Sequence, residues 1–202
     1  MVVSAFGLAT RITRRRSFSW LGAAAGALAH RQAYAVDPEV PIRLQVGLLD
    51  RVIPFDRNFT SRVHGRLAVV VVVDKSSEDS LRVGAQVESE LEARDSLGGY
   101  PLLAVRVSFS GASALAESCK RLAAGIVYVT PGVGESTSAL ASSLRGLRVL
   151  TVGAVPEQVA EGLILGAAVR SAKPRILVNL SCARQQDVDF RADFLRMVEV
   201  VG

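Results

Sequence analysis

The fold is decided by the stretch Leu67-Ala68-Val69-Val70-Val71-Val72-Val73, seven aliphatic residues that end at Asp74-Lys75. An uninterrupted apolar run of this length buries both faces of a strand, as the central strands of a parallel sheet do. The polar segment that follows, up to Asp79, has serine caps and acids suited to a helix N-terminus. The run therefore predicts a central strand in an α/β domain.

Strand and helix patterns alternate around this run. The further expected strands are residues 101–107, 125–129, 149–152, 163–169 and 175–180, of which the last two form an antiparallel hairpin. The expected helices are residues 40–55, 80–94, 110–122, 136–144, 155–161 and 190–200. In the second helix Leu81, Val87 and Leu91 should face inward, and Gly84 on the same face permits close packing. We expect a three-layer α/β fold: a mostly parallel sheet with a C-terminal antiparallel hairpin and helices on both faces.

The charge balance argues against nucleic-acid binding. The 202 residues include 24 Lys and Arg against 19 Asp and Glu, which gives a formal charge of +5. Five of the arginines and no acid fall in residues 1–35, so the remainder carries 19 basic and 19 acidic side chains. A neutral domain has no bulk electrostatic attraction to phosphate backbones. Half of the residues are hydrophobic, which is typical of a folded domain with a substantial core.

Residues 10–35 have the order of an export signal. Arginines come first, an apolar run of about ten residues follows from Trp20 to Ala29, and Ala33-Tyr34-Ala35 has the small residues of a cleavage site, Ala33 and Ala35. The run is about half as long as a membrane-spanning helix. Arg15, Arg16 and Phe18 resemble the twin-arginine export motif.

We therefore expect residues 1–35 to be a twin-arginine signal peptide and residues 36–202 to form one soluble periplasmic domain. The alternative is a basic amphipathic tail on a cytosolic protein. Val36-Asp37-Pro38 favours export, because it has the character of a mature N-terminus.

Catalytic residues do not converge in this sequence. After the leader the only histidine is His64, in the polar segment Asn58 to Gly65 that we expect to be a loop, and no Gly-x-Ser-x-Gly elbow exists. One histidine and two distant cysteines do not give the spacing of a zinc site. Asp74, Glu78 and Asp79 fit helix capping better than cation binding. We therefore expect no enzyme activity, no metal and no cofactor.

A glycine loop, Thr130 to Ser136, follows an expected strand and opens a helix. Such a position is where ligands bind in open α/β sheets, so Thr130, Gly132, Gly134 and Ser136 form a candidate ligand loop. No lysine follows the glycines, which excludes a nucleotide-hydrolase P-loop. A plain tight turn is the alternative.

Cys119 and Cys182 are the only cysteines. In an oxidising compartment they are candidates for a disulfide, which would stabilise the fold by roughly 3–4 kcal/mol if closed without strain. The alternatives are two buried thiols, or an exposed cysteine that pairs with another chain. The sequence is compatible with a homodimer as well as with a monomer.

The order of motifs resembles the YfiR-like family of periplasmic regulators over Ile42 to the C-terminus. Each motif is a short strand, turn or helix pattern, and the order and spacing carry the resemblance. The motifs are Gly98-Gly99-Tyr100-Pro101, Gly125 to Val129, Leu147 to Val152, Glu161-Gly162, Arg175 to Leu180 and Phe194 to Val201. The chain departs from the family at Val52-Ile53-Pro54-Phe55, where a Trp-Pro pair is usual, at Tyr100 in place of Arg, and at Gly125 in place of Cys.

The resemblance implies a periplasmic repressor of an inner-membrane signalling protein, a diguanylate cyclase or a sensor kinase. The repressor would bind the periplasmic sensor domain of its partner and hold it inactive, and release would raise cytoplasmic cyclic-di-GMP and favour biofilm. A periplasmic small-ligand sensor without catalysis is the alternative function.

Overall fold

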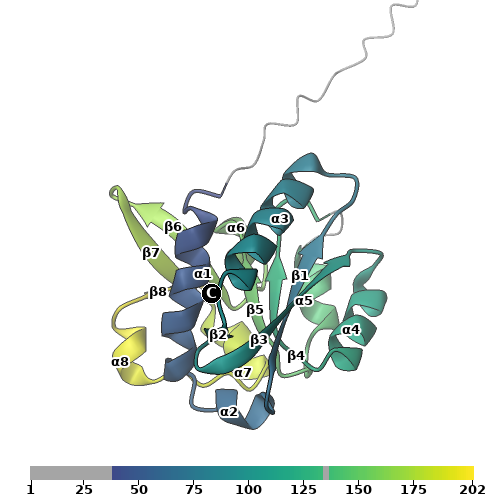
Figure 1. Cartoon of the computed structure of the whole chain (residues 1–202). Helices are drawn as coiled ribbons and strands as arrows, with labels where there is room; N and C mark the ends of the chain where they lie inside the picture. Colours follow the sequence, from purple (N-terminus) through teal and green to yellow (C-terminus); the bar gives the residue numbers. More distant parts are fainter. Residues whose placement is uncertain (1–37, 134–136) are drawn as a thin grey trace, which may run out of the picture. The chain divides into compact units, whose positions relative to one another are not determined.

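The computed structural model describes residues 38–133 and 137–202, whose strands form one eight-stranded sheet in the order β2-β3-β1-β4-β5-β6-β7-β8. The strands are β1 (Leu67–Val73), β2 (Ser96–Leu97), β3 (Tyr100–Ser108), β4 (Ala124–Val129), β5 (Leu150–Gly153), β6 (Leu165–Arg170), β7 (Lys173–Val178) and β8 (Glu199–Val200). The β3-β1-β4-β5-β6 pairings are parallel, and β6 and β7 form an antiparallel hairpin. These findings confirm the expected α/β fold class (Figure 1).

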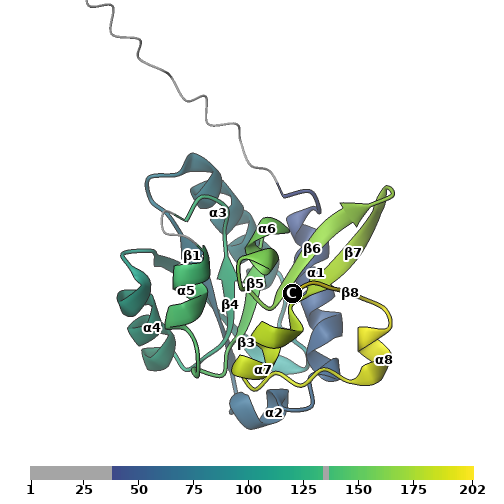
Figure 2. The ribbon, with the colours of Figure 1, turned by 180° about the vertical axis from the view of Figure 1, so that it is seen from behind.

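The helices cover both faces of this sheet. They are α1 (Ile42–Val52), α2 (Phe59–Arg62), α3 (Glu78–Glu92), α4 (Ala112–Arg121), α5 (Thr137–Ser143), α6 (Glu157–Ala160), α7 (Leu180–Gln185) and α8 (Ala192–Leu195), with a 3-10 turn, η1, at Ile53–Phe55. Helices α1 and α3 lie in front of the sheet in Figure 1, and α4 and α5 lie on its other face, as the reverse view in Figure 2 shows.

Strand β1 lies at the centre of the core. All seven of its residues are buried, as the uninterrupted aliphatic run predicts. Val69, Val71 and Val73 pack into the cluster under α1 and α3, while Val70 and Val72 pack into the cluster under α4 and α5. One strand therefore supplies apolar side chains to both hydrophobic layers, so neither layer forms without it.

The C-terminal region differs from the expected helix over residues 190–200. Helix α8 has only four residues, and β8 follows and pairs in parallel with β7 through Leu177↔Glu199 and Val178↔Val200. The apolar spacing around Phe194 fits one helical turn as well as a longer helix. The open backbone of β7 and the β-branched Val200 favour a strand, because pairing satisfies backbone groups that a helix end leaves free.

Three smaller expectations were also wrong. The segment Asn58 to Gly65 is not all loop, because α2 forms there and buries Phe59. Leu81 does not face inward and is 38% exposed. The last hairpin strand ends at Val178, because the side chain of Asn179 caps α7 by accepting a hydrogen bond from the backbone N–H of Cys182, 3.1 Å away.

Gly84 lies where α3 crosses β1, and the predicted close packing is confirmed. A Cβ atom at this position would lie 2.3 Å from Cγ1 of Val73, which is closer than real contacts allow. Gly47 in α1 gives the opposite case, because no atom lies within 4 Å of the Cβ it lacks.

We predict that Gly84→Ala and Gly47→Ala shift stability in opposite directions. Both changes favour a helix by up to about 1 kcal/mol. At Gly84 the clash with the buried Val73 should outweigh this gain and lower the free energy of unfolding by about 1–3 kcal/mol. Chemical denaturation of both variants measures the difference, and equal stability of the two would refute the close contact between α3 and β1.

Candidate functional site

The export-signal residues Arg15, Arg16, Phe18, Ala33 and Ala35 lie outside the residues that the structure describes. Within residues 38–133 and 137–202, no helix has the length and apolar character needed to cross a membrane. The export signal therefore stays a prediction from the sequence.

The candidate ligand loop is described only in part, since Gly134 and Ser136 lie outside the described residues. Thr130 is fully buried, and its hydroxyl is 2.7 Å from the carbonyl of Val72 and 2.5 Å from the hydroxyl of Ser80. Gly132 has φ +72°, and a Cβ there would lie 2.7 Å from Oγ of Ser77. The described part of the loop thus ties the end of β4 to the start of α3, and the Thr130 hydroxyl is used internally.

Cys119 and Cys182 are free thiols in this structure, and their pairing stays a prediction from the sequence. Cys119 is buried in the cluster under α4 and α5, whereas Cys182 packs from α7 against the cluster on the opposite face of the sheet. Cys182 also borders a hollow with Ala141 and Ser142 of α5. Burial raises the pKa of the Cys119 thiol to about 11, so it is protonated at neutral pH and is a poor nucleophile.

The described residues contain no group of three His, Cys, Asp or Glu side chains that could hold a metal ion. His64 is exposed just after α2. Asp74 accepts hydrogen bonds from the backbone N–H and the hydroxyl of Ser76, at 2.8 and 2.6 Å, and Ser77 caps α3. This geometry is that of a turn into a helix, as the capping interpretation predicts.

Helix α1 is fixed to the sheet by a buried polar contact. Nε2 of Gln45 donates hydrogen bonds to the carbonyls of Val40 and Ala154, at 2.8 and 3.1 Å, and the hydroxyl of Tyr128 donates to Oε1 of Gln45 at 2.8 Å. Burial raises the pKa of Tyr128, so the phenol stays protonated and remains a donor. Together with the buried apolar face of the helix, these bonds set which side of α1 faces outward.

The outward side of α1 carries apolar and basic side chains together. Leu44 is 49% exposed, and Leu48, one turn further along, is half-buried. We call this surface the α1 outer face; it borders a hollow of about 320 Å³ lined by Arg43, Leu44, Gly47, Leu48, Arg51, Arg94 and Pro174. Sequence reasoning missed it, although Leu44 and Leu48 are spaced four apart and lie off the stripe of Ile42, Val46 and Leu49.

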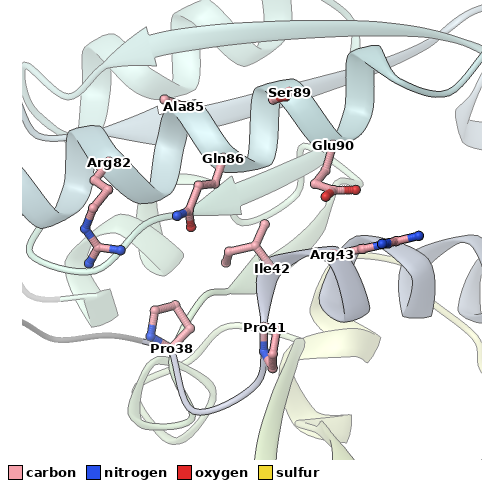
Figure 3. Close-up of a pocket in the computed structure, with 9 residues that line it drawn as sticks. All are labelled: Pro38, Pro41, Ile42, Arg43, Arg82, Ala85, Gln86, Ser89 and Glu90. Carbon is pink, nitrogen blue, oxygen red and sulfur yellow. The ribbon is translucent and has the colours of Figure 1, made fainter.

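A second hollow, of about 690 Å³, adjoins this face and runs between the start of α1 and α3. Figure 3 shows the side chains of Arg82, Gln86 and Glu90 on the side of α3 that faces the start of α1, with Gln86 pointing toward Ile42. We call it the α1–α3 groove. Arg43 lines both hollows, so the groove and the α1 outer face form one continuous surface.

A buried ion pair holds the segment after α1 in place. Asp56 and Arg62 form a charged contact, and Asp56 also accepts hydrogen bonds from the backbone N–H groups of Asn58 and Asp189, each at 3.1 Å. Burial lowers the pKa of Arg62 to about 10. The pair joins the end of α1 to the C-terminal segment, and its internal partners make it structural.

Comparison with known proteins gives a family and a fold. A family model described as YfiR/HmsC-like matches residues 73–199, which begin at the end of β1 and leave α1 outside the match. No curated protein is similar enough in sequence to serve as a relative.

Three solved structures have the same fold at low sequence identity, each aligned over 80% of this chain. They are a conserved domain protein from Vibrio cholerae (11% identity, TM-score 0.58), an ABC domain in complex with L-Trp from Streptococcus pneumoniae (10%, 0.58) and a ligand-free, open substrate-binding protein with adhesive properties from Clostridium difficile (13%, 0.56). This chain spans 60 to 62% of their lengths. At these identities the likeness concerns the fold alone.

We predict that Tyr128→Phe loosens α1. The change leaves Oε1 of Gln45 buried without its donor, which should lower the free energy of unfolding by about 1–3 kcal/mol. Tyr100→Phe is the matched control, because Tyr100 is half-buried with its ring against Phe59. The control should change stability by less than about 0.5 kcal/mol. If denaturation curves for the two variants coincide, the hydrogen bond does not hold α1.

Proposed function

The chain belongs to the YfiR/HmsC-like family of periplasmic regulators of cyclic-di-GMP signalling, and on this premise we propose that it represses an inner-membrane signalling protein. The proposed partner is a diguanylate cyclase, and the chain binds its periplasmic sensor domain. Release of the chain then raises cytoplasmic cyclic-di-GMP and favours biofilm. Export by the twin-arginine route, with cleavage after Ala35, is part of the proposal.

The observation that carries the proposal is the family match over residues 73–199, and the α1 outer face supports it. Stable interfaces combine an apolar centre with a polar rim in which arginine is enriched. Leu44 and Leu48 give the apolar centre, and Arg43 and Arg51 lie around it, together with Arg94, which pairs with Glu90 at 3.2 Å. This arrangement suits an apolar partner helix flanked by acidic side chains.

Repression of this kind needs differential binding rather than catalysis. A repressor shifts its partner to the inactive state only by binding that state more tightly than the active one. Driving a cyclase from almost fully active to almost fully inactive takes a ratio of affinities of about 10⁴. The α1 outer face can supply such a ratio if the inactive sensor domain presents a complementary surface that the active one withdraws.

The α1–α3 groove favours a second candidate function, a periplasmic small-ligand sensor. Its volume of about 690 Å³ is that of a small-molecule site, and Arg82, Gln86 and Glu90 line it. Arg82 pairs with Asp79 and Glu90 pairs with Arg94, at 3.1 and 3.2 Å. The solved structures of similar fold include a domain in complex with L-Trp and a substrate-binding protein. A rise in melting temperature with a small ligand, and no captured membrane protein, would favour this function.

We predict that Leu44→Glu weakens partner capture. A carboxylate in the apolar centre cannot be desolvated without a matching cation, so recovery of the partner should fall by about tenfold or more. The measurement is a pull-down of the exported chain, tagged at its C-terminus, from solubilised membranes. A captured membrane protein with a periplasmic sensor region and a cytoplasmic cyclase domain is the expected result.

Met197→Glu is the control for this experiment. Met197 is 57% exposed and belongs to the C-terminal segment, outside the residues that line the α1 outer face. It should capture as much partner as the unchanged chain. Equal capture by both variants would move the binding site away from α1, and no capture by the unchanged chain would count against repression.

We predict that the double change Arg15→Lys and Arg16→Lys blocks export. The twin-arginine route reads the arginine pair, whereas the general secretory route needs only positive charge before the apolar run. Cell fractionation should find the variant uncleaved in the cytoplasm and the unchanged chain in the periplasm, starting at Val36. Normal export of the variant would show that the general route carries this chain.

A further inference from the structure

The hairpin of β6 and β7 ends in a tip that lies away from the core. Residues 165–168 are buried, whereas every residue from Val169 to Arg175 is exposed. Figures 1 and 2 show this end of the hairpin extending beyond the other strands of the sheet. We call the residues from Val169 to Arg175 the hairpin tip. Its side chains are accessible to a partner on both faces of the two-stranded ribbon.

The charge of the hairpin tip has one sign. The tip contains Arg170, Lys173 and Arg175 and no acidic residue, and residues 162–186 as a whole include no Asp or Glu. Residues 36–202 carry equal numbers of basic and acidic side chains, 19 of each. The tip is therefore a local concentration of positive charge on a domain that is neutral overall.

The strand pairing places the three cations on one face. Arg170 lies opposite Lys173, and Arg175 lies opposite the buried Ala168. Opposite residues project to the same face, and so do alternate residues of one strand. Residues 171–172 form a two-residue turn with φ of +50° and +60°, which fixes this register. Because like charges directly opposite each other are unfavourable, an anion bound between them would stabilise the tip.

Only part of this charge is balanced by the chain itself. Nε of Arg170 lies 3.6 Å from a carboxylate oxygen of Glu199 on β8. Within residues 38–133 and 137–202, Lys173 and Arg175 have no acidic partner. The hairpin tip thus presents two exposed cations that are free to bind an external anion.

The opposite face of the hairpin tip is apolar. Val169 and Pro174 pair across the two strands, and Val169 is 38% exposed. The backbone N–H of Val169 donates to a carboxylate oxygen of Glu39 at 2.8 Å, which holds this strand at its outer edge. Cations on one face with apolar side chains on the other are typical of segments that lie in the interface of a membrane.

We propose that the hairpin tip binds the anionic headgroups of a phospholipid bilayer. Arg170, Lys173 and Arg175 contact the phosphates, and Val169 and Pro174 enter the boundary of the apolar layer. A bilayer offers an anionic layer with an apolar layer beneath it, which matches both faces of the tip. An acidic protein surface accounts for the charged face alone.

Three cations give weak and reversible binding, since stable attachment to a membrane takes a second signal. The second signal here is the proposed inner-membrane partner, which would hold the chain at a high effective concentration beside the bilayer. This location rests on the proposed function. Vesicle binding is measured without the partner, so repression and membrane binding can each fail without the other.

The first test compares two lipid compositions. At millimolar lipid, the purified chain from Val36 should co-sediment with vesicles that contain phosphatidylglycerol and not with vesicles of phosphatidylcholine alone, and high salt should weaken the binding. Each cation near an anionic surface changes the partition by about fivefold. Lys173→Glu changes the charge by two and should therefore weaken binding by about thirtyfold.

Lys120→Glu is the control for this test. It makes the same change of charge at a side chain that is 55% exposed on α4, outside the hairpin. It should bind vesicles within about twofold of the unchanged chain. Equal weakening by both variants, or equal binding to both lipid compositions, would overturn the proposal. Loss of partner capture by Lys173→Glu, in a chain that binds no vesicles, would assign the tip to a protein surface and overturn membrane binding.

The second test follows the apolar face and does not depend on charge. The only tryptophan of the sequence is Trp20 in the leader, so a tryptophan introduced after Val36 is a single reporter. Val169→Trp should shift its fluorescence to shorter wavelength when phosphatidylglycerol vesicles are added. Leu81→Trp is the matched control, because Leu81 is also 38% exposed but lies on α3. No shift at Val169→Trp, or the same shift in both variants, would overturn insertion of the tip.

Discussion

Burial of β1 on both faces is the constraint on which the rest of the structure depends. Its alternating valines lie in two separate hydrophobic clusters, one under α1 and α3 and the other under α4 and α5. A strand that is apolar on both sides is stable only between two helical layers, so the chain must cross the sheet repeatedly. The positions of β3 and β4 on either side of β1, and the two helical layers, follow from this central position.

The local sequence patterns predicted the centre of the fold better than its C-terminal edge. Long aliphatic runs were enough to predict β1, β4 and β5, because these strands are buried along their whole length. The turn before Pro174 was enough to predict the hairpin, although its tip is exposed. The helix predicted to continue after Phe194 was wrong, because a short apolar stretch fits a helix or a strand equally well. Pairing with the neighbouring β7 decides in favour of a strand. The prediction that Leu81 faces inward was wrong, because only the packing of α3 in the folded protein shows which of its residues face outward.

The candidate surfaces could be predicted even less from sequence. The sequence does not distinguish an exposed leucine such as Leu44 from a buried one. The hydrogen bond between Gln45 and Tyr128 shows which side of α1 faces the sheet. The sequence suggested pairing of the two cysteines from the expected compartment alone, whereas their environments, one buried under α4 and the other on α7, come from the tertiary structure. These features all arise from contacts between residues distant in sequence.

The central claim is that the exported chain holds a cyclase inactive, and the cyclic-di-GMP content of cells tests it most directly. Cells that lack this chain would be compared with cells in which the full chain, leader included, is supplied from a plasmid. The account predicts that loss of the chain raises cyclic-di-GMP and that the supplied chain restores the lower level. An unchanged level after loss of the chain would contradict repression, and a fall would show that the chain activates its partner.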